Sequence, residues 1–195
     1  MTKFSLFPLF IAGSLALGAC SPQNAASPTA TTQPAQPAQP WEAVAAQGKG
    51  FTVGSLMSAN AVYVLFDPQC PHCGHLWQAS LPLQAKIKFV WVPVAIMNAK
   101  SAPQAGALLS ATNPVEAMTQ HEQSILAGTG GTSASASLSS ELEQSIKGNT
   151  ALFNSLGVES VPYVLAKNLK TGQLVTHSGA MTTAELAEFV GVSAP

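Results

Sequence analysis

Two cysteines separated by two residues carry the chemistry that this sequence suggests. Cys70 and Cys73 form a close pair, whereas Cys20, the third cysteine of the 195-residue chain, stands far from both. The thiolate is the nucleophile of disulfide exchange, and a helix N-terminus stabilises such an anion. We therefore interpret Cys70 as the attacking thiol and Cys73 as the resolving thiol. We expect the two to form a disulfide with each other or with a substrate.

The two residues between the cysteines favour a reactive Cys70. Pro71 suits the first helical turn, because a residue there has no intrahelical partner for its backbone N–H. His72, when protonated, places a positive charge beside the sulfur, and such a neighbour lowers a thiol pKa from about 8.5 into the range of roughly 3.5 to 7.5. A stabilised thiolate makes the disulfide a better oxidant, so the motif predicts an oxidising couple.

Two other interpretations of the cysteine pair are weaker. A purely structural disulfide is disfavoured, because a two-residue spacer closes almost no loop. Cys70, His72, Cys73 and His75 also have the ligand types of a soft metal site, with a copper chaperone as the concrete case. Successive residues of one helical turn point in different directions, which argues against four convergent ligands. We predict no metal and no other cofactor, and we expect His75 on the helix surface.

A strand and a helix must position this pair. The apolar run 61–66 is typical of a buried strand, and the residues after Cys70 have helical character until Pro82 ends or kinks the helix. Asp67, the only aspartate of the chain, either starts the turn between strand and helix or helps proton transfer to Cys73. The pattern favours the turn.

Apolar runs, caps and turn residues predict the other elements. Further strands are expected at 51–53, 87–92, 161–166 and 173–177. Helices are expected at 41–47, from 101, at 114–127, at 139–156 with an interruption at Gly148, and at 182–190. Trp77, Phe89 and Trp91 are expected in the core, and Trp41 is expected to pack onto the domain.

Residues 1–19 are typical of a bacterial signal peptide. Lys3 is the basic region, and the apolar stretch 4–17 is too short for a comfortable membrane span. The end of this stretch, Leu17-Gly18-Ala19-Cys20, resembles a lipobox and predicts that Cys20 is lipidated. The alternative is an ordinary signal peptide that is cut nearby, with Cys20 incidental. Ser21 after the cysteine favours anchoring at the inner leaflet of the outer membrane.

The rest of the chain divides into a tether and a domain. Residues 20–40 contain five prolines and no charged side chain, which predicts an extended tether with a reach of roughly 60 Å at most. Residues 41–195 are expected to form the folded domain. The formal net charge is -1 and the chain has no arginine, which excludes a nucleic-acid footprint and a polybasic membrane patch.

The order of these elements resembles the thioredoxin fold, which belongs to the α/β class. A helical insertion is expected at about 98–157. Within that fold, Asp67-Pro68-x-Cys70-Pro71-x-Cys73 resembles the DsbG/DsbC family of periplasmic thiol–disulfide oxidoreductases, nearest to DsbG. The resemblance implies that Pro162 is the cis-proline beside the C-x-x-C pair and that Val161 and Pro162 bind an extended substrate. The alternative is a trans proline at the start of a strand.

Three departures qualify the resemblance. The N-terminal dimerisation domain of the family is missing, which predicts a monomer. His72 stands where DsbG-like motifs carry an aromatic residue, and the resulting Cys-Pro-His-Cys is that of the oxidase DsbA. Val161 before the proline is also DsbA-like. In addition, Val64 occupies the position of the buried acid of thioredoxin.

The sequence thus predicts a periplasmic thiol–disulfide oxidoreductase tethered to the membrane through lipid on Cys20. Its expected partners are substrate proteins with thiols or disulfides and a DsbB-like or DsbD-like membrane redox protein. Oxidation of substrates is favoured. The alternative is a reductase or isomerase that a DsbD-like protein keeps reduced.

Overall fold

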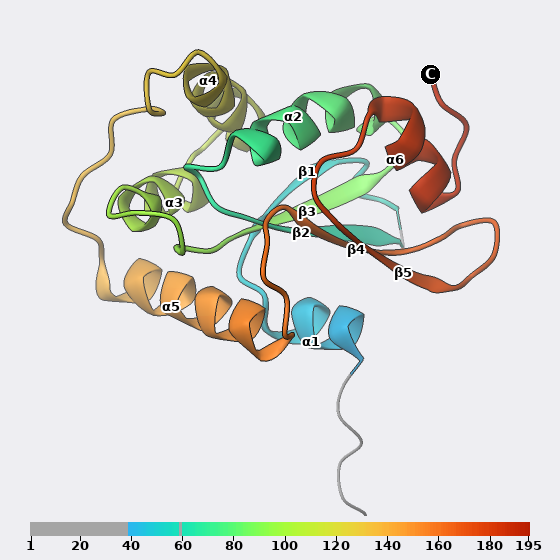
Figure 1. Cartoon of the computed structure of the whole chain (residues 1–195), viewed down its shortest axis with the longest axis horizontal. Coiled ribbons are helices and arrows are strands. Elements are labelled where there is room, and N and C mark those ends of the chain that lie inside the picture. The colour runs from blue at the N-terminus through green and yellow to red at the C-terminus, as the bar shows by residue number, and fades with distance from the viewer. Residues whose placement is uncertain (1–38, 59) are drawn as a thin grey trace, which may run out of the picture. The chain divides into compact units, whose positions relative to one another are not determined.

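Five strands form one mixed sheet in the computed structural model, which describes residues 39–58 and 60–195 (Figure 1). The predicted signal peptide, the lipidation site Cys20 and nearly all of the tether lie outside the described residues. The strands are β1 Phe51–Gly54, β2 Ala61–Phe66, β3 Lys88–Pro93, β4 Tyr163–Lys167 and β5 Leu174–Ser178. Their order across the sheet is β1-β3-β2-β4-β5.

The central strand β2 ends immediately before the C-x-x-C segment. It pairs in parallel with β3 and antiparallel with β4, so that Val64 lies opposite Trp91 on one side and Val164 on the other. The two outer strands are antiparallel to their neighbours, β1 to β3 and β5 to β4. A strand that is buried on both faces and paired on both edges gives the following residues a rigid starting point.

Helices cover both faces of the sheet (Figure 1). One face carries α2 Pro71–Ser80, α4 Pro114–Leu126 and α6 Thr183–Val190, and the other carries α1 Pro40–Gln47 and α5 Ser140–Ser155. α3 Ser101–Leu109 packs against both α4 and α5, and the short 3-10 helix η1 Leu81–Leu83 follows α2 directly. None of the helices in the described part of the chain is long and apolar enough to cross a membrane.

The alternation of side chains along the strands builds a separate core on each face. The core beneath α2 contains the predicted residues Trp77, Phe89 and Trp91, and the two indole rings meet edge to face with centroids 5.2 Å apart. The opposite core lies beneath α1 and α5. Trp41 packs there edge-on against Tyr63, with ring centroids 5.6 Å apart, which confirms its packing role.

The helix ends follow the predicted caps. The Asn113 side chain accepts from the backbone of Glu116 at the start of α4, and Ser139 caps α5 in the same way. α6 begins with the complete capping box of Thr182 and Glu185. It ends at Gly191, whose φ of 80° is left-handed and suits glycine.

Two local predictions were wrong. The helix α5 runs without a break through Gly148, because that glycine faces open space and needs no special backbone geometry. Strand β4 begins at Tyr163 and not at 161, since Pro162 has no N–H to donate to a neighbouring strand. The three helices between β3 and β4 form the expected insertion.

Candidate active site

Cys70 occupies the N-cap position of α2, with Pro71 as the first helical residue. Its backbone N–H donates to the carbonyl of Asp67 across the turn that leaves β2, with an N–O distance of 3.0 Å. The cysteine sulfur therefore lies where the free N–H groups of the helix converge. Both placements are those that the spacing of the motif predicts.

The Val161–Pro162 segment lies against the cysteine pair, and its peptide bond is cis, as predicted. The Cys70 sulfur lies 3.5 Å from the Val161 carbonyl oxygen, to which it donates when protonated, although the residues are 91 positions apart. Pro162 is buried and Val161 is half-buried. The fold thus brings together the two segments to which the sequence assigns the exchange chemistry.

The Cys70 thiol is mostly buried, with 4% of its surface exposed, and it is acidic. A hydrogen bond from the Cys73 thiol lowers the pKa of Cys70 to about 6 against the opposing effect of burial. The backbone N–H groups of Cys73 and His72 lower this pKa further, and the charge of His72 makes the smallest contribution. The direction of this pKa shift is the one that the sequence predicts, but the sequence did not predict its largest cause, the hydrogen bond from Cys73.

Cys73 has the opposite character. Its side chain is completely buried, and burial raises its pKa well above the ordinary value. The hydrogen bond to Cys70, the charge on Cys70 and the charge of Glu122 raise it further. At neutral pH the pair therefore consists of one thiolate and one thiol, a combination that suits an attacking and a resolving cysteine.

The histidines of α2 do not converge on the cysteines as ligands would. His72 and His75 are both exposed, and their ring centroids are 6.4 Å apart. Within residues 39–58 and 60–195, no group of three or more His, Cys, Asp or Glu side chains is arranged to hold a metal ion. The position of His75 on the helix surface is the one that the sequence predicts.

The carboxyl group of Asp67 connects the cysteine turn to the segment after β3. It is completely buried and accepts four hydrogen bonds, at 2.7–3.0 Å. The donors are the backbone N–H groups of Gln69, Ile96 and Met97 and the Ser101 hydroxyl. Asp67 therefore starts the turn, as predicted, and it also fixes a loop about 30 residues away, which the sequence did not predict.

A second polar network joins the turn to the helical insertion. The Gln69 amide donates to the side-chain oxygen of Gln104 and to the carbonyl of Gly130, and Gln104 donates to Gly130 as well. His121 on α4 donates from Nε2 to the Pro68 carbonyl at 2.7 Å. Local sequence patterns do not indicate these contacts, because they join residues from separate helices and loops.

Glu122 is the functional candidate that the sequence analysis missed. Its side chain is 1% exposed, and neither carboxyl oxygen has a hydrogen-bond partner among the described residues. Burial raises the pKa of this carboxyl to about 9, and the charges of Cys70 and Asp67 add to the rise. The only available indication was a charged residue at an otherwise inward-facing position of α4.

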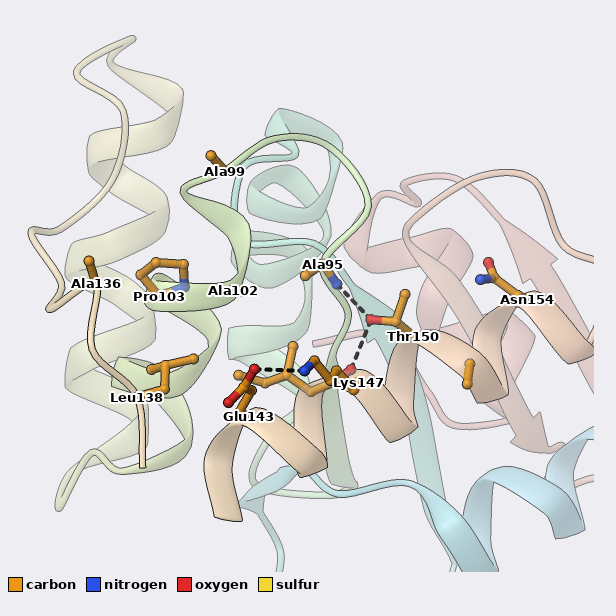
Figure 2. Close-up of a pocket in the computed structure, with 12 residues that line it drawn as sticks. Ala95, Ala99, Ala102, Pro103, Ala136, Leu138, Glu143, Lys147, Thr150 and Asn154 are labelled. Atoms are coloured by element: carbon orange, nitrogen blue, oxygen red, sulfur yellow. Dashed lines mark hydrogen bonds and ion pairs between the residues drawn. The ribbon is translucent and has the colours of Figure 1, made fainter. Parts of the chain in front are cut away.

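A groove of about 700 Å³ lies apart from the cysteines, between α5 on one side and the start of α3 with the segments 95–99 and 136–138 on the other. Figure 2 shows its floor, where the Ala95 backbone donates to the Thr150 hydroxyl, and the exposed ion pair between Lys147 and Glu143. Neither cysteine lines this groove. The cysteine pair lies at the junction of β2 and α2, outside this groove.

Comparison with known proteins gives relatives of one kind. The thiol:disulfide interchange protein DsbG of Pseudomonas aeruginosa is 28% identical over 140 residues, which are 71% of this chain and 54% of the relative. DsbG of Escherichia coli is 29% identical over 118 residues, 58% of this chain and 47% of the relative. The chain thus spans about half the length of the curated relatives it matches. No family model matches it.

Among solved structures, a periplasmic thioredoxin-like protein from Salmonella enterica serovar Typhimurium superimposes with a TM-score of 0.57. The match has 16% sequence identity and covers 77% of this chain and 93% of that chain. At this identity the likeness concerns the fold. The chain is thus similar to DsbG proteins in sequence, and it has a thioredoxin fold with a helical insertion between β3 and β4.

Proposed function

We propose that the protein is a thiol–disulfide oxidoreductase that exchanges disulfides with substrate proteins through Cys70 and Cys73. The observation that carries this proposal is the geometry of the two thiols: Cys70 lies at the N-cap of α2 and within 3.5 Å of the carbonyl before the cis-proline, and Cys73 is completely buried. Burial and a hydrogen bond keep Cys73 protonated, and the same bond lowers the pKa of Cys70 to about 6. The similarity to DsbG proteins supports the same reaction.

The oxidised protein reacts in two displacement steps. A substrate thiolate attacks the Cys70 sulfur, the Cys70–Cys73 bond breaks, and Cys73 leaves with the electron pair and takes up a proton. A second substrate thiolate then attacks the substrate sulfur of the mixed disulfide and releases Cys70 as a thiolate. The substrate dithiol loses two electrons and becomes a disulfide, and the protein becomes a dithiol.

The Val161–Pro162 segment would hold the substrate during these steps. The Val161 carbonyl lies 3.5 Å from the Cys70 sulfur, so an extended peptide aligned there has its own sulfur close to the attacking thiol. Backbone pairing of this kind recognises a peptide regardless of its side chains. This property suits an enzyme with several protein substrates.

Oxidation of substrates is the direction that the site favours. The same contacts that stabilise the Cys70 thiolate stabilise the reduced protein, which makes its disulfide a stronger oxidant. The alternative, a reductase or isomerase maintained by a DsbD-like protein, is supported by the similarity to DsbG. An oxidase would instead be regenerated by a DsbB-like membrane protein.

The reduction potential distinguishes these directions. We would equilibrate the protein with glutathione buffers and follow the disulfide by tryptophan fluorescence, with Cys73→Ser as the variant that cannot form it. A potential near about -120 mV supports the oxidase, whereas a value of about -200 mV or below supports the reductase or isomerase. Failure of Cys73→Ser to trap mixed disulfides in cells would contradict the exchange mechanism itself.

The proposed location is the periplasm, with the protein anchored by lipid on Cys20. The lipobox-like sequence and the composition of residues 20–40 support this part of the proposal. Cell fractionation of the wild type and of Cys20→Ser tests it. The wild type should sediment with outer membranes, and the variant should be released in soluble form. A wild-type protein that is already soluble would contradict the anchor.

A further inference from the structure

The carboxyl group of Glu122 is buried against the active-site helix without any visible structural purpose. A buried carboxyl that makes no hydrogen bond costs free energy, so a fold keeps one only where something offsets the cost. Both of its oxygens lack a partner among the described residues. The one ion pair in this part of the chain joins Lys147 to Glu143, so no cation is paired with Glu122.

The contact between α2 and α4 places this carboxyl beside the helical turn that holds Cys73. Gly74 allows the close approach, because a Cβ atom there would lie 2.9 Å from a carboxyl oxygen of Glu122. Cys73, the residue before Gly74, is completely buried. The negative charge of Glu122 acts directly on the ionisation of that thiol.

The titratable groups around Glu122 come from three places. α2 contributes the thiols of Cys70 and Cys73, and the end of β2 contributes Asp67. On α4 itself, His121 is bound through both ring nitrogens, by the Pro68 carbonyl and by Thr132. Among these neighbours, the thiols are the groups that change charge when a disulfide forms or breaks.

We propose that Glu122 exchanges a proton with Cys73 in each reaction cycle and so supplies the buried acid that Val64 does not. The proposal rests on the thiol–disulfide exchange proposed above. Its geometric basis is the unpartnered, buried carboxyl packed at Gly74, one residue from the resolving thiol. Cys73 has no exposed surface through which water could remove or deliver its proton.

The proton balance follows the two directions of exchange. When a substrate thiolate attacks Cys70, the S–S bond breaks and Cys73 leaves as a thiolate, which takes the proton of the neutral Glu122 carboxyl. Solvent returns a proton to Glu122 in a later step through the 1% of its surface that stays exposed, whereas Cys73 has no exposed surface. In the reverse direction the Glu122 carboxylate accepts the proton of Cys73, and the new thiolate attacks the mixed disulfide and expels the substrate thiolate. No further oxidant or reductant is needed.

The charge state of Cys70 influences how readily Glu122 gives up its proton. The Cys70 thiolate contributes to the high pKa of the Glu122 carboxyl, and that contribution disappears when Cys70 is bound in a mixed disulfide. Glu122 then loses its proton more easily, at the stage where a base is required for Cys73. The same event also removes one cause of the high pKa of Cys73.

The test follows the two steps separately in the full-length protein. Reduced protein is mixed with oxidised glutathione between pH 5.5 and 9.5, quenched with acid, and analysed by mass spectrometry. The first step, attack by Cys70, depends on the glutathione concentration, and the second, attack by Cys73, does not. We expect Glu122→Gln to leave the first step within about twofold of wild type and to slow the second roughly 100-fold at pH 7.

Three comparisons separate proton exchange from a structural role. Glu122→Gln should also lose the dependence of the second step on carboxyl ionisation, whereas Glu122→Asp should retain it and recover part of the rate. Glu116→Gln, an exposed position on the same helix, should behave as wild type. Equal second-step rates and pH profiles in wild type and Glu122→Gln would overturn the proposal. If the wild type itself forms no mixed disulfide, the proposed exchange activity fails, and not only the role of Glu122.

Discussion

Cys70 is activated mainly by its partner cysteine and only slightly by the histidine between them. The hydrogen bond from the Cys73 thiol is the largest cause of the low Cys70 pKa, and the charge of His72 is the smallest. We expect the rate of alkylation of Cys70 by iodoacetamide to rise with pH around an apparent pKa of about 6. Cys73→Ala should move this midpoint upward by more than His72→Ala does.

The measurement is rapid alkylation of the reduced protein followed by peptide mass mapping. Cys73 serves as an internal control, since a buried thiol with a raised pKa should remain unmodified over the same time. A larger shift in His72→Ala than in Cys73→Ala would reverse the assignment and restore the importance that the motif alone gave to the histidine.

Glu122 should lower the stability of the protein as the pH rises. Its pKa in the folded protein, about 9, lies above its ordinary value of 4.5. The stability that this group contributes is therefore complete below about pH 4.5 and is lost as the pH rises through about 9. Glu122→Met should be more stable than wild type by roughly 3 kcal/mol at pH 7 and nearly equal to it at pH 4.

Urea unfolding of both proteins at the two pH values provides the comparison. Glu116→Met controls for the added apolar side chain, and it should show no difference in stability that grows with pH. If Glu122→Met is less stable than wild type at neutral pH, the carboxyl has a structural partner that the present geometry does not contain.

The packing of α2 on α4 depends on the absence of a side chain at Gly74. A Cβ atom there would meet Glu122 at 2.9 Å and the Leu126 Cγ atom at 3.1 Å. We expect Gly74→Ala to destabilise the protein by about 1 to 3 kcal/mol through overpacking. Gly148→Ala is the matched change, because no atom lies within 4 Å of its Cβ position.

In the middle of α5, alanine should stabilise the helix by about 0.5 to 1 kcal/mol relative to glycine. Thermal or urea unfolding of the two variants therefore should give effects of opposite sign. Equal destabilisation by both changes would show that the close contacts at Gly74 are not what distinguishes the two positions.

Local sequence patterns predicted the elements well but predicted little of the contacts between them. Caps such as Asn113 and Thr182 act within one turn, and the Cys70 turn is likewise local, so the sequence reveals them. The contacts of Glu122 and Gln104 form only where α4 and α3 pack near the cysteine turn. These contacts between helices depend on packing over the whole helical insertion, and no short sequence pattern predicts that packing.

The whole molecule should be more stable with its active site reduced than oxidised. In the folded dithiol form the pKa of Cys70 is about 6, below its ordinary value of 9.0. Its contribution to stability is complete above about pH 9 and is lost as the pH falls through about 6. We expect the reduced protein to exceed the disulfide form by roughly 3 kcal/mol at pH 8, with the difference shrinking toward pH 6.

Denaturation of the two redox forms at several pH values would measure this difference. Cys70→Ser provides the control, since its stability should not follow the same pH dependence. A disulfide form that is the more stable at pH 8 would contradict an oxidising role, because the exchange equilibrium and the unfolding equilibria form one thermodynamic cycle.

The attachment of the loop that follows β3 places little constraint on the identity of two of its residues. Asp67 holds Ile96 and Met97 through their backbone N–H groups alone, at 2.7 and 3.0 Å. Their side chains are 40% and 49% exposed and take no part in this attachment. Almost any residue except proline therefore satisfies the anchor at these two positions. Substitutions at these positions should therefore change the exposed surface of the loop while the two hydrogen bonds that attach it to Asp67 remain.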